Sequence, residues 1–491
     1  MNVMKIKNIG LVLLLVGSMG CSDFLKESSQ DEVRPSTVEE LESVLLGDVY
    51  PRGDMLKVDV MTDDMQCNGA KAVWGSDAPY EKHLEDWREI YCWTWEPIMM
   101  TSFGVWEDYY KRIMGCNVVM DELPEVAGTD AQKAFLRGQC LTLRAHFYFL
   151  LVNYFGTPYN FGDPAKNPGV PLKLESGVRD EYFTRASVAA VYEQIEQDLL
   201  EANRLMTENA SVVSVYEISR LVPKALLARV YLYMEEWDKA IDFANQLIAA
   251  KPQLCSYMDI SKLGGTYLSV KTTGVYDPEE SNEIIWLYRG LPHRIFDFNQ
   301  LTQKPPYSAS ETLVGLYEDK ADAVDMRKKA FVTYFDLFMA YKTPLIINRS
   351  KDWYSLGIRT AEVYLNRAEA YARKYAESGE EECRTKALTD LNHLREHRYD
   401  TRIAAYKPVM YSNANDLLGF CQEERRRELC FEEYHRWFDL RRYGMPAIKH
   451  VYIGPGQVRQ EFTLEAQSPR YVLPIPQAAI DANPNLSQNP Q

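Results

Sequence analysis

Apolar residues recur at three- and four-residue spacing over long stretches of this chain, and this pattern constrains its fold more than any other feature. Such spacing places the apolar side chains on one face of an α-helix, and that face must be buried against a neighbour. Loops that carry Pro and Gly separate the periodic stretches. The pattern predicts a mainly α chain with helical segments at Ala134–Tyr154, Ser187–Met206, Val222–Ala250, Thr360–Glu377, Cys383–Tyr399 and Leu417–Tyr443.

Small residues in these segments follow the offsets of a tetratricopeptide helix pair. Alanine allows two helices to cross closely, and a terminal proline ends the second helix. The pattern occurs in Ala228…Tyr231…Ala240…Pro252 and, with a longer turn, in Ala368…Tyr371…Ala387. We therefore predict a tetratricopeptide-like scaffold of stacked helix pairs.

The helical spacing fails in two stretches, between Thr62 and Phe103 and from Ser256 to Thr343. Gly, Pro and aromatic residues are frequent there, together with short β-prone runs such as Ile284–Tyr288. These insertions, near residues 62–103 and 256–343, are predicted to form an irregular, loop-rich face with a few short strands. Binding surfaces usually lie on such segments when a rigid frame holds them.

The first twenty residues have the pattern of a secretion signal. Lys5 and Lys7 precede an apolar run from Ile9 to Val16, which is well short of the about 20 apolar residues that a membrane-spanning helix needs. Small residues follow and lead to Cys21. We predict that this segment is removed from the mature protein.

Cys21 follows Ser-Met-Gly, which resembles a lipobox, where the cysteine is acylated and becomes the mature N-terminus. Several acyl chains on one residue would anchor the protein durably to a membrane. A plain signal peptide with an incidental cysteine is the alternative. The predicted organisation is a lipoprotein signal peptide over residues 1–20, a lipidated tether over 21–37 and one domain over 38–491.

Composition excludes one class of partner. With 70 acidic and 55 basic residues the net charge is −15, whereas nucleic-acid binding needs clustered Lys and Arg. No nucleic-acid partner is therefore expected. Eight cysteines follow Cys21 without any C-x-x-C spacing, and they are predicted to be buried rather than to bind zinc or form disulfides.

Two patterns resemble parts of enzyme sites. His393, Glu396 and His397 form H-x-x-E-H, which on a helix sets two imidazoles one turn apart, as in inverted zincins. No third ligand stands out downstream, so we predict two solvent-facing histidines and no metal. We also find no nucleophile elbow, phosphate-binding glycine loop or dinucleotide fingerprint, so no catalytic residue and no cofactor are predicted.

The charged segment from Glu423 to Arg442 could be mistaken for a set of catalytic carboxylates. Glu428, Glu432 and Arg436 fall four residues apart, which suits a ladder of ion pairs along one helix face. Asp439 and Arg442 would extend the ladder. A structural role is predicted, because catalytic carboxylates belong in a cleft with separated pKa values.

Aromatic residues provide the best functional signal, since five of the nine Trp lie between Trp74 and Trp106. Trp106 has helical spacing with its neighbours and is predicted to lie in the core. Trp87 is ambiguous, whereas Trp74, Trp93 and Trp95 fall where the helical spacing breaks. Flat aromatic rings stack well on sugar rings. The alternative is that these rings fasten the irregular segment to the scaffold. The predicted ligand-binding residues are Trp74, Tyr80, Trp93 and Trp95, with a second wall formed by Arg294 and Tyr307.

Sequence blocks spread from Cys21 to the last residues resemble the SusD/RagB family. The first is Phe135-Leu136-Arg137…Arg144-Ala145-His146-Phe147-Tyr148, which leads into Tyr154-Phe155-Gly156-Thr157-Pro158-Tyr159. Later blocks are Arg185-Ala186-Ser187-Val188, Ala361-Glu362-Val363-Tyr364-Leu365, Leu391-Asn392…Leu394-Arg395…Arg398, Glu424-Arg425…Arg436-Trp437…Asp439-Leu440…Arg442 and Leu473-Pro474-Ile475-Pro476. Their number and order make a chance match hard to credit.

The resemblance implies a surface-exposed lipoprotein of the outer membrane. Such a protein captures an oligosaccharide or polysaccharide and delivers it to a SusC-type TonB-dependent transporter. A peptide-binding member of the same family is one alternative. A surface lipoprotein hydrolase is another, and it would need an acid, a base or a metal that is not legible in the sequence.

Overall fold

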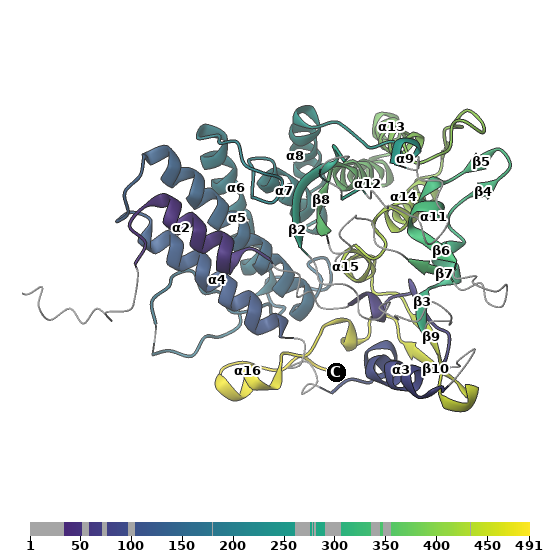
Figure 1. Ribbon diagram of the computed structural model, residues 1–491, viewed down its shortest axis with the longest axis horizontal. Helices are drawn as coiled ribbons and strands as arrows, with labels where there is room; N and C mark the ends of the chain where they lie inside the picture. The colour runs from purple at the N-terminus through teal and green to yellow at the C-terminus, as the bar shows by residue number, and fades with distance from the viewer. Residues whose placement is uncertain are drawn as a thin grey trace, which may run out of the picture.

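Long helices pack in pairs on one side of the molecule, and short strands and loops occupy the other side (Figure 1). The computed structural model describes residues 34–51, 58–70, 76–96, 104–178, 180–260, 275–276, 278, 281–289, 306–334, 344–346, 355–432 and 434–491. One hydrophobic core spans the helices and reaches the strand-rich side, where a smaller cluster lies. The predicted mainly α fold with a few short strands is confirmed.

The first helical layer contains α2 (Val38–Val44), α4 (Val105–Glu122), α5 (Asp130–Phe155) and α6 (Val188–Glu208). A capping box begins α5, in which the Thr129 hydroxyl accepts from the Gln132 backbone N–H and the Gln132 side chain accepts from the Thr129 N–H. Gly138 lets α6 approach closely, because a Cβ there would lie 2.4 Å from Met206 Cγ. Trp106 is buried in α4, as predicted.

Two helix pairs form the centre of the scaffold: α7 (Val222–Tyr233) with α8 (Trp237–Ala250), and α12 (Thr360–Ser378) with α13 (Glu381–Glu396). Ala228 and Ala240 are fully buried where the first pair crosses. Ala387 has the same role in the second pair. The predicted tetratricopeptide-like pairs are thus confirmed, because alanine at these positions leaves room for the neighbouring backbone.

The strand-rich side holds antiparallel two-stranded pairs, and one of them joins the two predicted insertions. Met65 lies opposite Ala309, and Cys67 lies opposite Tyr307. The run Ile284–Tyr288 forms a strand, as predicted. The pairs in the described residues are β1 (Met65–Cys67) with β3 (Tyr307–Ala309), β2 (Ile284–Arg289) with β8 (Ser355–Arg359), β4 (Asp319–Lys320) with β5 (Ala323–Val324), β6 (Val332–Tyr334) with β7 (Pro344–Ile346), and β9 (Ile448–Ile453) with β10 (Arg459–Leu464).

The prediction that helical spacing fails throughout residues 62–103 is wrong, because α3 (Ala78–Tyr91) lies inside that range. Tyr80, Leu84 and Trp87 are buried at spacings of three and four residues, with Pro79 in the first turn. Half of the residues in α3 are polar, and three of its five buried side chains are aromatic. The same residues therefore also fitted an irregular segment.

The predicted helix Leu417–Tyr443 is interrupted. It divides into α14 (Ala414–Leu429) and α15 (His435–Arg442), and Phe431 between them has φ +53°. Such a conformation is uncommon for a residue with a side chain and ends the regular helix. The two helices are therefore separate elements, and several charged residues of this region pair with other parts of the chain rather than along one helix.

The eight cysteines that follow Cys21 are all buried, as predicted. Burial raises the pKa of the Cys140 thiol to about 12, which keeps it protonated and unreactive. Among the described helices, none combines the length and the apolar character that crossing a membrane requires.

His146 lies in the middle of α5 and predicts a pH dependence of stability. It is 2% exposed, and burial, aided by the Arg229 guanidinium, lowers the pKa of His146 to about 3. Histidine in an unfolded chain has a pKa of about 6.5, so the unfolded state binds more protons between these two values. The stability that neutral His146 contributes is therefore present above about pH 6.5 and is lost as pH falls through the folded-state pKa.

The free energy of unfolding of wild type should fall between about pH 7 and 5. We expect this fall to be smaller by about 2 kcal/mol in His146→Phe. Urea unfolding at both pH values measures this difference. His397→Phe is a matched control, because His397 lies half-exposed at the end of α13. Equal pH dependence in wild type and His146→Phe would contradict the assignment.

Candidate functional site

Four of the six predicted ligand-binding residues lie in the described structure, on segments of the strand-rich side. Tyr80 belongs to α3, Trp93 and Trp95 follow it, and Tyr307 begins β3. The other two, Trp74 and Arg294, lie outside the described residues, as does the predicted lipidation site Cys21.

An aromatic stack surrounds Trp93. The His450 ring of β9 lies between Tyr91, at 4.1 Å between centroids, and Trp93, at 4.2 Å. Trp93 Nε1 donates to the Met61 carbonyl at 3.2 Å, and its side chain is 3% exposed. The Tyr307 hydroxyl donates to the Leu84 carbonyl at 2.8 Å and is fully buried. These contacts join α3, β3 and β9 into one packed unit.

His450 fastens this unit through its nitrogens. Nδ1 lies 2.7 Å from the Tyr91 carbonyl oxygen and Nε2 lies 2.9 Å from the Thr62 carbonyl oxygen. Burial lowers the pKa of His450 to about 4, and the two carbonyl contacts oppose that shift. The neutral ring carries one N–H and donates to one of these carbonyls, while the aromatic stack holds both of its faces, which suits a structural role.

Trp95 is packed separately, against the C-terminal segment. Its Nε1 donates to Gln491 Oε1 at 3.0 Å, and the Arg470 guanidinium lies 5.7 Å from its ring centroid. Trp95 and Tyr80 are each 1% exposed. All four described residues thus have a packing role, which is the alternative that the sequence left open. Ligand contact by any of the six residues stays a prediction.

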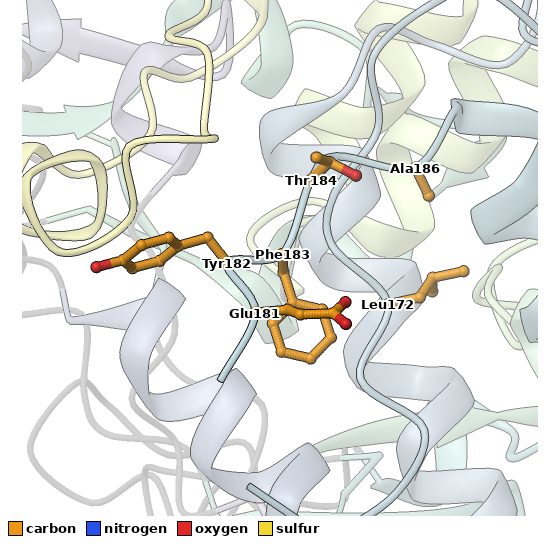
Figure 2. Close-up of a pocket in the computed structure, with 6 residues that line it drawn as sticks. All are labelled: Leu172, Glu181, Tyr182, Phe183, Thr184 and Ala186. Atoms are coloured by element: carbon orange, nitrogen blue, oxygen red, sulfur yellow. The ribbon is translucent and has the colours of Figure 1, made fainter. Parts of the chain in front are cut away.

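A pocket of about 280 Å³ lies elsewhere, along the segment between α5 and α6 (Figure 2). Two backbone carbonyls of this segment are held by the C-terminal segment, because Asn483 Nδ2 donates to Phe183 O at 2.8 Å and Asn485 Nδ2 donates to Tyr182 O at 3.1 Å. Tyr182 is 58% exposed and projects away from Glu181 and Phe183. The pocket is lined by Leu172, Glu181, Tyr182, Phe183, Thr184 and Ala186.

Sequence reasoning missed this pocket. The adjacent aromatic residues Tyr182 and Phe183, set among polar residues just before α6, were the available signal. Periodicity does not reveal such a site, because the pocket forms only where the C-terminal segment holds the loop. An exposed phenol ring beside a carboxylate and a hydroxyl offers both stacking and hydrogen bonding to a polar ligand.

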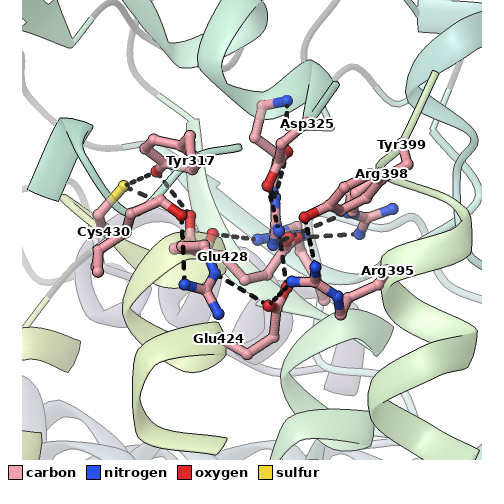
Figure 3. Close-up of polar contacts among 12 residues, drawn as sticks. Tyr317, Asp325, Arg395, Arg398, Tyr399, Glu424, Glu428 and Cys430 are labelled. Atoms are coloured by element: carbon pink, nitrogen blue, oxygen red, sulfur yellow. Dashed lines mark hydrogen bonds and ion pairs between the residues drawn. The ribbon is translucent and has the colours of Figure 1, made fainter. Parts of the chain in front are cut away.

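A network of buried ion pairs lies beneath the strand-rich side. Figure 3 shows Glu424 and Glu428 of α14 facing Arg395 and Arg398 at the end of α13. Arg395 Nη1 lies 2.6 Å from Glu424 Oε2, and Arg398 Nη2 lies 3.0 Å from Glu428 Oε1. The network also includes Glu283, Asp325, Arg327, Arg359 and Glu432.

The arginines of this network hold Glu428 ionised. Burial alone raises the pKa of a carboxyl group, but Arg398, Arg359 and Arg327 hold the pKa of Glu428 well below its usual range. A general acid or base needs a pKa near the working pH, and Glu428 lacks it. The arrangement therefore suits a structural function, as predicted for the charged segment.

The predicted ladder along one helix face is wrong for most of its members. Glu428 and Glu432 both contact Arg359 from β8, and Arg436 contacts Asp63, at 2.7 Å. Only the Asp439–Arg442 pair, at 2.9 Å, lies within one helix. The break between α14 and α15 explains the difference, because it turns these residues toward other elements.

The H-x-x-E-H pattern lies at the end of α13. His393 and His397 are half-buried rather than solvent-facing, with ring centroids 4.8 Å apart, and His393 also packs on Tyr364. His397 Nδ1 lies 2.8 Å from the His393 carbonyl oxygen. Within the described ranges, no three His, Cys, Asp or Glu side chains are grouped to hold a metal ion.

Two family models match the chain and together span most of it. The model described as "SusD family" matches residues 271–491, and the one described as "Starch-binding associating with outer membrane" matches residues 23–232. A SusD-like protein of Formosa agariphila is 28% identical over 173 residues. That match covers 35% of this chain and 31% of the relative, so it spans about a third of the relative's length.

Solved structures share the fold along nearly the whole chain. A SusD-like carbohydrate-binding protein from Bacteroides vulgatus has a TM-score of 0.68 at 20% identity, covering 92% of this chain and 97% of its own. A SusD superfamily protein from Bacteroides thetaiotaomicron has a TM-score of 0.69 at 22% identity, covering 93% and 100%. A laminarin-binding SusD-like protein has a TM-score of 0.58 at 21% identity, covering 93% and 99%. The chain belongs to the SusD/RagB family.

Proposed function

We propose that this protein captures glycans at the cell surface and delivers them, without chemical change, to a SusC-type TonB-dependent transporter. The observation that carries the proposal is that SusD-type models match both halves of the chain. The carbohydrate-binding and laminarin-binding proteins of the same fold support a glycan as the ligand. The pairing of Glu428 with arginines, which lowers its pKa, supports capture rather than catalysis.

We propose that Trp74 and Arg294, which lie outside the described residues, contact the glycan. Tyr80, Trp93 and Tyr307 lie inside the packed unit of α3, β3 and β9, which would give the strand-rich side a rigid base. Trp95 would hold the C-terminal segment against the same side. Such a design matches the rule that adaptable binding residues are carried on a rigid base.

The test of glycan capture uses the purified Cys21→Ala chain, which lacks the predicted acylation site. We expect it to bind at least one class among α-glucans, β-glucans, fructans and host glycans on an array. Trp74→Ala should then weaken binding to that class by about 5- to 150-fold, which corresponds to about 1–3 kcal/mol for a lost aromatic contact.

Tyr182→Ala is the matched control, because Tyr182 is an exposed aromatic residue beside the pocket. It should leave glycan affinity unchanged. The reverse result, with Tyr182→Ala weakening binding and Trp74→Ala not, would move the ligand site to the pocket. Binding of peptides but of no glycan would overturn the proposed ligand, and release of shortened glycan products would overturn the non-catalytic role.

We also propose that acylated Cys21 anchors the protein to the outer membrane, facing outward. The match of residues 23–232 to a model described as associating with the outer membrane supports this location. Cys21→Ala should shift the protein from the membrane fraction to the soluble periplasm, because the secretion signal remains while the acylation site is lost. Protease treatment of intact cells measures the exposure of the wild-type chain. A wild-type chain that resists added protease would contradict surface display.

A further inference from the structure

Buried arginines in the described part of the chain follow one rule, with a single exception. Each of them except Arg441 has a carboxylate within 4.0 Å. This rule is expected, because a guanidinium group stays charged and is costly to bury without a counter-charge. Arg441 is 2% exposed and has no carboxylate partner among the described residues.

Hydrogen bonds leave most of the Arg441 head group unsatisfied. Nη2 donates to the Gly156 carbonyl, whereas Nε and Nη1 have no partner among the described residues. Arg185 makes a useful contrast, because it also lacks a carboxylate. Its guanidinium donates to the carbonyls of Phe155, Pro168, Gly169 and Ser487 and to Asn489 Oδ1, so it is well satisfied without an anion.

Two hydroxyl groups on segments that interact with Arg441 are also unsatisfied. Thr157 directly follows Gly156, whose carbonyl accepts from Arg441, and its Oγ1 is buried with no partner in the described structure. The Tyr233 hydroxyl is in the same condition, and Tyr233 interacts electrostatically with Arg441. Unpaired polar groups thus occur on Arg441 and on two segments that interact with it. Buried groups of this kind normally bind a ligand or an ordered water.

The charge balance near α15 points to an anion. The carboxylates nearby are already paired with other arginines, which leaves the Arg441 charge in excess. These pairs are Arg229–Glu362 at 2.6 Å, Arg425–Asp439 at 2.7 Å and Arg442–Glu369 at 2.5 Å.

We propose that Arg441 binds a monovalent anion the size of chloride, which the hydroxyl groups of Thr157 and Tyr233 also contact. The single excess charge matches a monovalent ion, whereas a phosphate or sulfate would leave a negative charge buried without compensation. The aromatic side chains of Tyr192 and Tyr233, which interact electrostatically with Arg441, favour a weakly hydrated ion. Bound there, the anion would stabilise the junction between the end of α5 and α15.

The first test measures the melting temperature of the purified chain at constant ionic strength, with chloride replacing gluconate. We expect the melting temperature to rise by about 2 °C for each tenfold increase in chloride above the dissociation constant. Bromide should act like chloride, and crystals grown in bromide should show an anomalous peak beside Arg441. The same melting temperature in both salts would overturn the proposal, as would a bromide-grown crystal with only water at that position.

Variants separate this site from general salt effects. Arg441→Met should abolish the chloride dependence of the melting temperature. Thr157→Val, at a half-buried position, should raise by about tenfold the chloride concentration at which the melting temperature begins to rise. Arg185→Met is the matched control: it should lower stability but keep the chloride dependence. Should Arg441→Met fail to fold, Thr157→Val alone decides, and an unchanged chloride response in that variant would overturn the site.

Discussion

Replacing Glu428 with Gln is expected to lower the free energy of unfolding by about 3–5 kcal/mol, the range for breaking one partner out of a buried ion pair. Glu428 is fully buried and lies 2.9 Å from Arg359 Nη1 and 3.0 Å from Arg327 Nη1. Glutamine has nearly the same shape as glutamate but no charge. The surrounding guanidinium groups would therefore remain buried away from water but would lose part of the negative charge that offsets the cost of burying them. Chemical unfolding monitored by tryptophan fluorescence measures the change.

Glu423→Gln is the control for this experiment, because Glu423 lies on the same helix and its side chain is 55% exposed. Its pairing with Arg427, at 3.5 Å, should be worth no more than about 0.5 kcal/mol. A loss smaller than about 1 kcal/mol in Glu428→Gln would mean that the network is hydrated or adaptable rather than buried and fully paired.

Trp93→Ala and Trp95→Ala are each expected to cost about 3–5 kcal/mol of folding stability, because truncation of a buried indole leaves a cavity and an unpaired backbone or side-chain acceptor. Trp93 would lose its stack with His450 and its bond to Met61. Trp95 would release Gln491 and Arg470. Calorimetric or chemical unfolding of each variant measures the loss.

The same variants distinguish packing from ligand contact. Tyr182→Ala changes an exposed residue and serves as the control. The free energy of unfolding of this variant should differ from that of wild type by no more than about 0.5 kcal/mol. If either tryptophan variant kept wild-type stability but bound glycan more weakly, the ring would have to face a ligand, and the stacking wall predicted from the sequence would be restored. We expect instead that both tryptophan variants lose much of their folding stability.

The helical scaffold could be predicted because its signal is local. The apolar spacing of α5 and α6, the small residues at the α7–α8 and α12–α13 crossings and the turn residues between them are all present in the sequence. Each of these features acts within one helix or one helix pair. The family resemblance rested on blocks in the same helices, and the family models confirm it.

Two elements were misread because competing signals overlapped. The buried positions of α3 include Tyr80 and Trp87, which are as common in irregular binding segments as in amphipathic helices. The segment after Leu429 keeps helical spacing, yet Phe431 adopts a left-handed conformation between α14 and α15. Tertiary contacts made by Glu432, including its bond to Arg359 at 2.6 Å, hold that break in place.

The candidate site was harder to predict than the fold. Trp crowding after residue 73 drew attention to this region, but the sequence did not reveal whether Trp93 and Trp95 face solvent or the interior. That outcome depends on β9 and on Gln491, which lie hundreds of residues later in the chain. The pocket around Phe183 and the unpaired Arg441 likewise depend on long-range neighbours.

The sequence by itself therefore determined the helix pairs, the alanine crossings, the family and the burial of the cysteines, because each follows from residue type and spacing. Only the tertiary structure decided which arginine meets which carboxylate, which tryptophans are buried and which guanidinium lacks a partner. Periodicity reports which side chains share a face of one helix. It does not report which distant segment packs on that face, and the partners of Glu428, Trp95 and Arg441 are all set by such segments.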